Sequence, residues 1–412
     1  MSIFYPDYSS GFNDLDSLAK SLLDRLKPIS WPFSLDELPI GSALVGGAVR
    51  DGLLASVDNN PDLDFIVPSD AVILAQKLSN RCGGTCVILD QERDIARLVI
   101  KNWTIDFAKQ IGDALNEDLS RRDFTINAIA LTLGSQPKLV DPFNGIKDLK
   151  NKILVAISEE NLVEDPLRLL RAFRLMSELN LSINQETQVY LNRHAKLLNN
   201  VAPERIKNEI QRLIKASCAD KAIFALYETR LLDLWRYKSK VFISQFDYLQ
   251  DSKNFDPKEL RIALPLARLV NLLTDQGLQS LKFSRKDILR CQNLRKWREK
   301  NDGVGFQTLK ESDLFQLHIE LESCLPALII QLPKEYQLMW LTRWRDPKDA
   351  LFHPSSPLDG NALQKILGVP EGPIIGEIIK HLSIEKAFNR LQNREEAVQL
   401  ARNLWKQKQP LL

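Results

Sequence analysis

The spacing of hydrophobic residues predicts a mixed α/β region in the first part of the chain. Leucines recur every three or four positions over residues 15–26, a spacing typical of an amphipathic helix. The short apolar runs DLDFIV (62–67), TCVILD (85–90) and WTIDFA (103–108) are separated by polar turns, which predicts β-strands. A longer apolar stretch over 71–83 ends at a glycine and predicts a helix between the first two strands.

The second part of the chain has the pattern of a helical protein. The segment 121–133 fits either a helix or a strand, but strand patterns nearly vanish after residues 141–154. Long amphipathic stretches dominate from Asp165 onward, so the predicted fold class is α+β, with a mixed α/β head followed by an all-α region. We divide the chain into an N-terminal helical segment (1–35), the α/β head (36–150), a neck (151–215), a helical body (216–352) and a helical tail (353–412).

Composition and charge exclude some classes of protein. Lys and Arg number 55 against 53 Asp and Glu, so any nucleic-acid surface has to be a local concentration of basic residues. We expect no membrane span and no signal peptide, because no apolar stretch approaches about 20 residues and the start MSIFYPDYSS lacks a basic region before an apolar run. Five scattered cysteines suit a reducing cytosol, and we predict a cytoplasmic protein. The C-x3-C pair Cys82 and Cys86 has no second pair or nearby histidine, which favours two small thiols over a zinc site.

Acidic residues inside the apolar strands are candidates for metal chemistry. Asp62 and Asp64 are two positions apart on a predicted strand, so their side chains project from one face. Two adjacent carboxylates repel each other unless a cation lies between them, and Mg2+ favours such oxygen ligands. Asp106 lies in a second apolar strand and is a candidate third carboxylate on the same face. Two exposed aspartates on an edge strand remain the alternative interpretation.

A glycine turn shortly before these acids suggests phosphate binding. LVGGAVRD (44–51) places Gly46 and Gly47 between a predicted strand and a predicted helix. Glycines allow backbone N–H groups to approach a phosphate, and Arg50 adds positive charge. A tight strand–helix turn that needs glycine for its φ angles is the alternative.

Six motifs in order carry a resemblance to a known family. GGAVRD, DLDFIV, RRDFTINAIA, DPFNG, EDPLRLLRAFR and PERIKNEIQRLI, together with the later segment 357–379, resemble the class II tRNA nucleotidyltransferases. That family includes CCA-adding, CC-adding and A-adding enzymes and bacterial poly(A) polymerases. The resemblance implies a nucleotidyltransferase head with helical neck, body and tail. It also implies template-independent addition of nucleotides to the tRNA 3′ end from CTP, and from ATP in some members, with release of pyrophosphate.

The resemblance also implies roles for individual residues. Asp62 and Asp64 would hold Mg2+, with two ions expected, and Asp106 would be the third catalytic carboxylate. The tail would contact tRNA, and the neck would recognise the base. The residues implied to bind the nucleotide are Gly46, Gly47, Arg50, Asp51, Arg121, Arg122, Asp123, Asn127, Asp165, Arg168, Arg171 and Arg174. Taken alone, Arg121–Asp123 would also fit a surface ion-pair cluster.

The pair Asp165 and Arg168 offers a chemical basis for selecting cytosine and adenine. The two residues are three positions apart at a predicted helix start, so they share a face. Both bases present an amino donor beside a ring-nitrogen acceptor, which a carboxylate and a guanidinium can match. Uracil and guanine present the reverse order and would leave both side chains unpaired. A simple capping role for Asp165 remains open.

A basic stretch in the predicted body is a candidate RNA surface. Residues 282–300 contain only two acids, and Trp297 offers a stacking surface. The candidate RNA-binding residues are Lys282, Arg285, Lys286, Arg290, Arg295, Lys296 and Arg298. An exposed basic helix without a partner is the alternative.

The segment after Asp106 favours one branch of the resembled family. CCA-adding and A-adding members carry a flexible segment there, whereas FAKQIGDALN (107–116) is very short. A site that recognises two bases of different size needs a movable element, so the sequence favours a CC-adding enzyme whose product a complementary A-adding enzyme would complete. Full CCA addition, A addition, poly(A) synthesis and a non-catalytic RNA-binding protein that kept the fold remain the alternatives.

Overall fold

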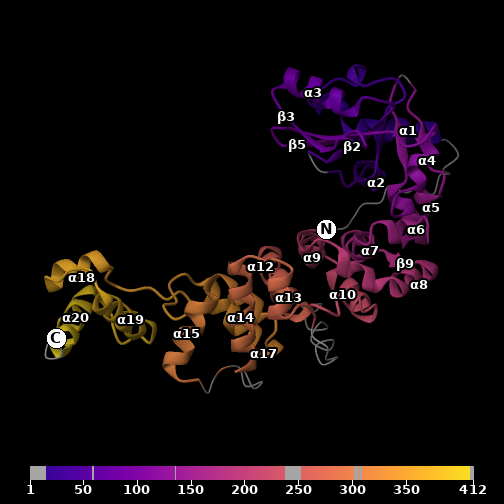
Figure 1. The fold of residues 1–412 in the computed structure, drawn as a ribbon. Helices are drawn as coiled ribbons and strands as arrows, with labels where there is room; N and C mark the ends of the chain where they lie inside the picture. The colour runs from indigo at the N-terminus through magenta and orange to yellow at the C-terminus, as the bar shows by residue number, and fades with distance from the viewer. Residues whose placement is uncertain are drawn as a thin grey trace. The chain divides into compact units, whose positions relative to one another are not determined.

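The computed structural model describes residues 15–57, 60–134, 136–236, 252–300, 306 and 309–408. The chain divides into two compact units, Met1–Val201 and Ala202–Leu412 (Figure 1). The predicted α+β fold class, a mixed α/β head followed by helices, is confirmed. The finer division into five parts stays a prediction, and residues 1–14 of its first segment lie outside the described residues.

The first unit is built around a seven-stranded sheet. The strand order is β3-β4-β5-β2-β1-β6-β7. Its strands are β1 (Ala43–Val45), β2 (Leu63–Val67), β3 (Thr85–Asp90), β4 (Ile95–Ile100), β5 (Trp103–Lys109), β6 (Ala130–Thr132) and β7 (Leu139–Val140). The helices of this unit are α1 (Leu15–Leu26), α2 (Gly47–Leu53), α3 (Ala71–Cys82), α4 (Leu115–Ser120), α5 (Gly145–Asn151), α6 (Glu159–Glu164), α7 (Leu167–Leu179) and α8 (Gln185–Arg193), with short 3-10 turns between them.

One face of the sheet is covered by apolar packing over its central strands. Phe65 on β2 stacks on Phe107 of β5 with ring centroids 5.4 Å apart, and Trp31 and Phe33 pack edge-on or tilted against them. Each such aromatic pair contributes about 0.5–1.5 kcal/mol beyond its buried area. Helix α3 packs against β3, β4 and β5. This packing fixes which residues of β2 and β5 point to the opposite face.

The opposite face is only partly covered. Near β1 and β6 it carries a small core in which Leu119 of α4 packs with Val45, Ile66 and Ala130. Towards β5 and β4 the alternate positions of the strands are polar or partly exposed, including Asp64 and Asp106. An uncovered strip therefore remains beside α4.

The neck region differs from the expected all-helical pattern at one point. Ser182–Ile183 (β9) pairs in parallel with Ile153–Leu154 (β8) to form a two-stranded sheet. Two residues are too short to give a periodic signal in the sequence. Residues 121–133, which fitted helix or strand, contain a 3-10 turn at Thr125–Asn127 followed by β6.

The second unit contains only helices among its described residues. These are α9 (Pro203–Lys215), α10 (Ala219–Glu228), α12 (Pro257–Leu272), α13 (Asp275–Ser280), α14 (Arg285–Glu299), α15 (Glu311–Leu321), α16 (Leu325–Ile329), α17 (Lys334–Arg345), α18 (Gly360–Leu367), α19 (Pro373–Ala387) and α20 (Arg394–Lys408). Helices α18, α19 and α20 enclose a core of their own around Leu363 and Leu382. Across the described residues, no helix has the length and apolar character needed to cross a membrane.

Candidate functional site

Three charged side chains lie in one row across the uncovered strip. Parallel pairing of β2 with β5 places Asp64 beside Asp106, and antiparallel pairing of β5 with β4 places Asp106 beside Arg97. Directly paired residues project from the same face of a sheet. The order across the strip is therefore Arg97, Asp106, Asp64. Asp62 lies just before β2 and is exposed.

Arg97 binds the carboxylate of Asp106 through two hydrogen bonds. Its Nε donates to Oδ1 and its Nη2 donates to Oδ2, both at 2.8 Å. The bond to Asp106 raises the pKa of the Arg97 guanidinium. The sequence interpretation did not single out Arg97, although an arginine within an otherwise apolar strand is a visible signal.

The carboxylate of Asp64 lies in an environment that disfavours its charge. Burial raises the pKa of Asp64 to about 6. Arg122 acts against this rise, Asp106 and Asp62 add to it, and Arg171 again lowers it. A carboxylate with this balance gains more from a nearby cation than an exposed one does.

Gly46 closes the approach to Asp64 from the side of β1. Its φ of 74° and ψ of −135° are unfavourable for residues with a side chain. A Cβ on Gly46 would lie 3.1 Å from Oδ2 of Asp64 and 3.4 Å from Nη1 of Arg122. The turn therefore needs glycine both for its backbone angles and for the space beside the carboxylate. Gly47 follows as the first residue of α2.

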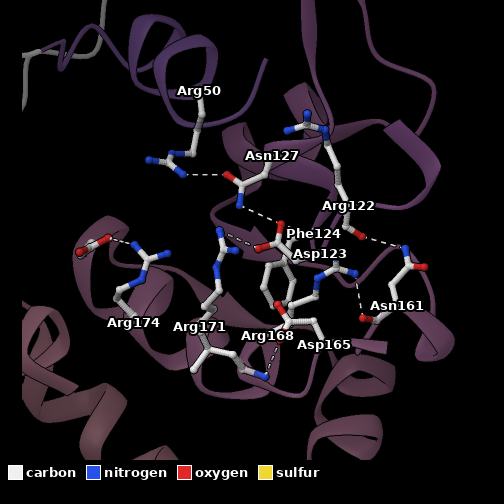
Figure 2. A network of polar contacts seen from close by, with 12 residues as sticks. Arg50, Arg122, Asp123, Phe124, Asn127, Asn161, Asp165, Arg168, Arg171 and Arg174 are labelled. Carbon is white, nitrogen blue, oxygen red and sulfur yellow. Dashed lines mark hydrogen bonds and ion pairs between the residues drawn. The ribbon is translucent and has the colours of Figure 1, made fainter. Parts of the chain in front are cut away.

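A buried chain of polar contacts joins α2 to α7 (Figure 2). Arg50 on α2 pairs with Asp51 and donates to Oδ1 of Asn127 at 2.7 Å. The Asn127 amide donates to Oδ1 of Asp123 at 3.1 Å, and Nη2 of Arg171 lies 3.1 Å from Oδ2 of Asp123. Burial acts to raise the pKa of Asp123, but Arg171, the Asn127 amide and a backbone N–H together lower it. Asp123 is therefore an anion held inside the protein, which makes the surface ion-pair interpretation wrong for this residue.

The two arginines of the RRD motif point to different surroundings. Arg121 pairs with Glu164 at 3.1 Å on the exposed surface. Arg122 lies 3.6 Å from Asp118, and its Nε is buried without a hydrogen-bond partner. Asn161 holds the backbone of this motif by donating to the carbonyl of Arg122 at 2.8 Å. Asn161 and Asp118 were not foreseen from the sequence, because neither belongs to a recognisable motif.

Near the start of α7, the side chains of Asp165 and Arg168 form hydrogen bonds with backbone groups (Figure 2). Asp165 lies between α6 and α7, and its Oδ1 accepts from the N–H of Leu167 at 3.3 Å, which is a capping contact. Arg168 donates from Nη1 to the carbonyl of Asn161 at 2.8 Å. Arg174 is buried, and its Nη1 lies 2.6 Å from Glu178 one turn further along. This placement favours a structural role for Arg174 over direct contact with a nucleotide.

A cavity of about 490 Å³ lies next to the row of charged residues. Ile95, Ala108 and Ile66 line it, and they form the adjacent row on the same face of the sheet. Acids line it at three positions and basic side chains at five, so its charge is positive on balance. The basic residues are Arg93, Lys109, Arg121, Arg122 and Arg168.

The segment between β5 and α4 is tied to α4 by short-range bonds. The N–H of Ile111 donates to Asp118 at 3.2 Å, and the N–H of Asp113 donates to Glu117 at 3.2 Å. The N–H of Gln110 donates to the carbonyl of Val67 at 2.8 Å. The short segment 107–116 is thus anchored at both of its sides.

In the second unit, the predicted basic surface is not continuous. Arg295 is buried, binds Asp275 and donates to the carbonyl of Leu273. Trp297 is 1% exposed and donates to Glu320, so it offers no stacking surface. The prediction of one RNA-binding patch is therefore wrong for Arg295, because its side chain packs into the helical core.

The other basic residues of this stretch divide into paired and unpaired ones. Lys282 pairs with Glu204 at 2.5 Å, Lys296 pairs with Glu320 at 2.8 Å, and Arg298 donates to Asn271. Of the seven candidate residues, Arg285, Lys286 and Arg290 are those whose side chains form neither an ion pair nor a hydrogen bond within the described part of the chain. Contact of RNA phosphates with these three, and with the exposed Lys282 and Lys296 and the partly exposed Arg298, stays a prediction.

Comparisons with known proteins show which family the chain resembles. Residues 42–155 match the family model "Poly A polymerase head domain", and residues 180–235 match "Probable RNA and SrmB- binding site of polymerase A". The CC-adding tRNA nucleotidyltransferase of Synechocystis sp. is 31% identical over 403 residues, which cover 91% of this chain and 96% of that protein. The A-adding tRNA nucleotidyltransferase of Deinococcus radiodurans is 39% identical over 205 residues, 48% of this chain and 46% of that protein.

Solved structures share the fold. A complex of a CCA-adding enzyme with ATP matches with a TM-score of 0.70 and 22% identity over 93% of this chain and 97% of that chain. The Synechocystis relative aligns along nearly the whole chain, and the head-domain match spans the row of carboxylates. This chain therefore belongs to the class II tRNA nucleotidyltransferase family.

Proposed function

We propose that this enzyme adds cytidines to the 3′ end of tRNA, transferring CMP from CTP without a nucleic-acid template and releasing pyrophosphate. The observation that carries the proposal is the row of Asp64 and Asp106 beside a cavity lined by five basic side chains. Such a cavity suits a nucleotide, because its cations can bind phosphate while its apolar sheet residues contact a base. The CC-adding relative that aligns along 91% of the chain supports cytidine as the added nucleotide.

We propose Mg2+ as the cofactor, with Asp62 and Asp64 as its protein ligands and two ions expected. Enzymes of this family generally use divalent metal ions. Within the described residues no three Asp, Glu, His or Cys side chains gather around one point, but Mg2+ commonly takes only one or two carboxylates and completes its shell with water and substrate phosphates. Gly46 keeps a side chain away from Oδ2 of Asp64, because a Cβ at this position would lie 3.1 Å from that oxygen. When bound, the metal would activate the tRNA 3′-hydroxyl and neutralise the leaving pyrophosphate.

The protein's own residues would hold the nucleotide. Arg122 has a buried Nε without a hydrogen-bond partner and lies beside the space next to Asp64, a position suited to a phosphate oxygen. Asp165 and Arg168 would read the cytosine edge by exchanging their backbone contacts for the base amino group and ring nitrogen. The chain from Arg50 to Arg171 would keep α2 and α7 at a fixed separation while this exchange takes place.

The anchored segment after β5 supports the limit to cytidine. Adenine is larger than cytosine, so a site that takes both in turn needs an element that moves. Here residues 111 and 113 are bonded to Asp118 and Glu117, which holds the segment against α4. The expected product is tRNA ending in two cytidines, which a complementary A-adding enzyme would complete.

Replacing Asp64 with asparagine is expected to stabilise the metal-free protein in a pH-dependent way. The pKa of Asp64 in the folded state is about 6, against an ordinary value of 3.8, so its contribution to stability is lost as pH rises through this range. The advantage of D64N should grow from about pH 4.5 to 6.5, then level off at about 2–6 °C in Tm. Thermal unfolding in EDTA from pH 4.5 to 8 measures it, and Mg2+ should shrink the difference by stabilising only the wild type. A pH-independent difference would contradict this electrostatic account.

Incorporation from labelled CTP and ATP tests the function directly. With tRNA that ends at the discriminator base, we expect two CMP additions, and AMP addition at less than about one tenth of that rate. Sequencing of the product 3′ ends measures both. Efficient AMP addition after two cytidines would show full CCA addition instead, and AMP addition only to tRNA ending in CC would show an A-adding enzyme. Runs of AMP added to unrelated RNA would indicate poly(A) synthesis. RNA binding without any nucleotide transfer would indicate a non-catalytic RNA-binding protein that kept the fold.

A further inference from the structure

We propose that Arg97 is a positioning residue of the catalytic centre. Its guanidinium, through the two hydrogen bonds from Nε and Nη2 (called here the fork), holds Asp106 in place for the transfer step, and its charge weakens metal binding at Asp64. The proposal rests on the proposed function for its catalytic half. It concerns a residue outside the motifs that carry the family resemblance. Its basis is the row in which Arg97, Asp106 and Asp64 occupy neighbouring strands.

The fork fixes the orientation of Asp106. A carboxylate has about four sites for accepting hydrogen bonds, and Nε and Nη2 of Arg97 occupy one on each oxygen at 2.8 Å. Two sites remain free to accept from a substrate hydroxyl or to bind a metal. Since Arg97 approaches from β4 and Asp64 lies on β2, Asp106 is held between a cation on one side and a carboxylate on the other.

Stability does not explain this ion pair. The side chains of Arg97 and Asp106 are 44% and 24% exposed, and ion pairs at such positions contribute little to folding. The pair nevertheless has the two-point geometry that gives an arginine–carboxylate contact its directional specificity. A lysine would keep the charge and lose this geometry.

The two effects of Arg97 on the centre act in opposite directions. Asp62, Asp64 and Asp106 together attract a divalent cation, and the guanidinium beside them reduces that attraction. Loss of its charge should therefore tighten metal binding. The same change frees Asp106 to rotate, so the transfer step should slow. Replacing a residue with a purely structural role would not both tighten metal binding and slow the transfer step.

Two substitutions and a matched control separate these effects. Arg97→Gln removes charge and fork, Arg97→Lys keeps only the charge, and Arg81→Gln is the control. Arg81 also forms an ion pair in the same unit, with Glu37 at 2.6 Å, and its side chain is 51% exposed. Mn2+ binding to the protein without tRNA or nucleotide is measured by electron paramagnetic resonance of free Mn2+. The kcat and KM for CMP addition are measured at saturating Mg2+, and thermal unfolding checks folding.

The expected results differ for each variant. R97Q should bind Mn2+ about three- to tenfold more tightly and lose about tenfold in kcat with little change in KM for CTP. R97K should bind Mn2+ like the wild type but show the same loss of kcat, and R81Q should resemble the wild type in both. Equal or weaker Mn2+ binding by R97Q, or wild-type kcat in either Arg97 variant, would overturn the proposal.

The experiment distinguishes failure of the Arg97 proposal from failure of the proposed function. If R97Q does not fold, the kcat of R97K decides whether the fork matters. If the wild type adds no CMP to tRNA, the proposed function fails, whereas Mn2+ binding to R97Q still supports or contradicts the effect of Arg97 on the metal site.

Discussion

Replacing Asp64 with alanine is expected to reduce CMP transfer to tRNA by about a thousandfold or more. The substitution removes the partly buried carboxylate at the centre of the row, and with it the proposed ligand that faces the space beside Gly46. Asp62 alone, exposed at the start of β2, would hold the metal too loosely to align it with a phosphate. Single-turnover incorporation from labelled CTP at saturating Mg2+ measures the loss.

The control for this prediction is Asp90→Ala. Asp90 ends the edge strand β3 of the same sheet, its side chain is 38% exposed, and it does not line the cavity. Its 3.8 Å ion pair with Arg93, which does line the cavity, is exposed and therefore weak. We expect its CMP transfer to stay within about twofold of the wild type, as for most surface substitutions. Filter binding should show unchanged tRNA affinity for D64A, because the change lies in the reacting centre. CMP transfer by D64A at the wild-type rate would eliminate Asp64 as a metal ligand.

Local patterns in the sequence predicted most elements of the head. The helix expected over residues 15–26 is α1, and the helix expected to end at a glycine is α3, followed by Gly83 at a φ of 71°. These features depend on neighbouring residues, which the sequence displays directly. The two-residue strand β9 was missed because its pairing with β8 joins residues about 30 positions apart.

The composition of the site was partly predictable as well. Alternation along the strands predicted that Asp62 and Asp64 project from one face of the sheet, with Asp106 as a candidate for the same face. The register that sets Asp64 beside Asp106 depends on tertiary pairing, which the sequence does not display. The neighbour on the other side was accessible to reasoning. A two-residue turn, Lys101–Asn102, joins β4 to β5 and fixes Arg97 opposite Asp106.

The basic stretch shows what charge alone does not reveal. Cys291, Leu294 and Arg295 share the buried face of α14, so Arg295 points into the core while Arg285 and Lys286 stay exposed. Burial of an arginine depends on partners from other helices, here Asp275 and the carbonyl of Leu273. Those partners are far from Arg295 in the sequence, which is why composition suggested a continuous surface.

Replacing Gly46 with alanine is expected to lower the rate of CMP transfer by about a hundredfold. The new Cβ would lie 3.1 Å from Oδ2 of Asp64 and 3.4 Å from Nη1 of Arg122, both of which would have to shift by some tenths of an ångström. The backbone angles of Gly46 also disfavour alanine, which should cost about 1–3 kcal/mol of folding stability. Single-turnover CMP addition and urea unfolding measure the two losses on the same preparation.

Gly83→Ala is the matched control, because it separates backbone strain from contact with the site. Gly83 also has a positive φ, 71°, but a Cβ there would have nothing within 4 Å. Its left-handed conformation should cost about 1 kcal/mol with alanine, without altering the position of any catalytic side chain. Under conditions in which both variants are fully folded, G83A should therefore transfer CMP at nearly the wild-type rate. If G46A did the same, the close approach of this turn to Asp64 would have no part in catalysis, and glycine at this position would serve only the geometry of the turn.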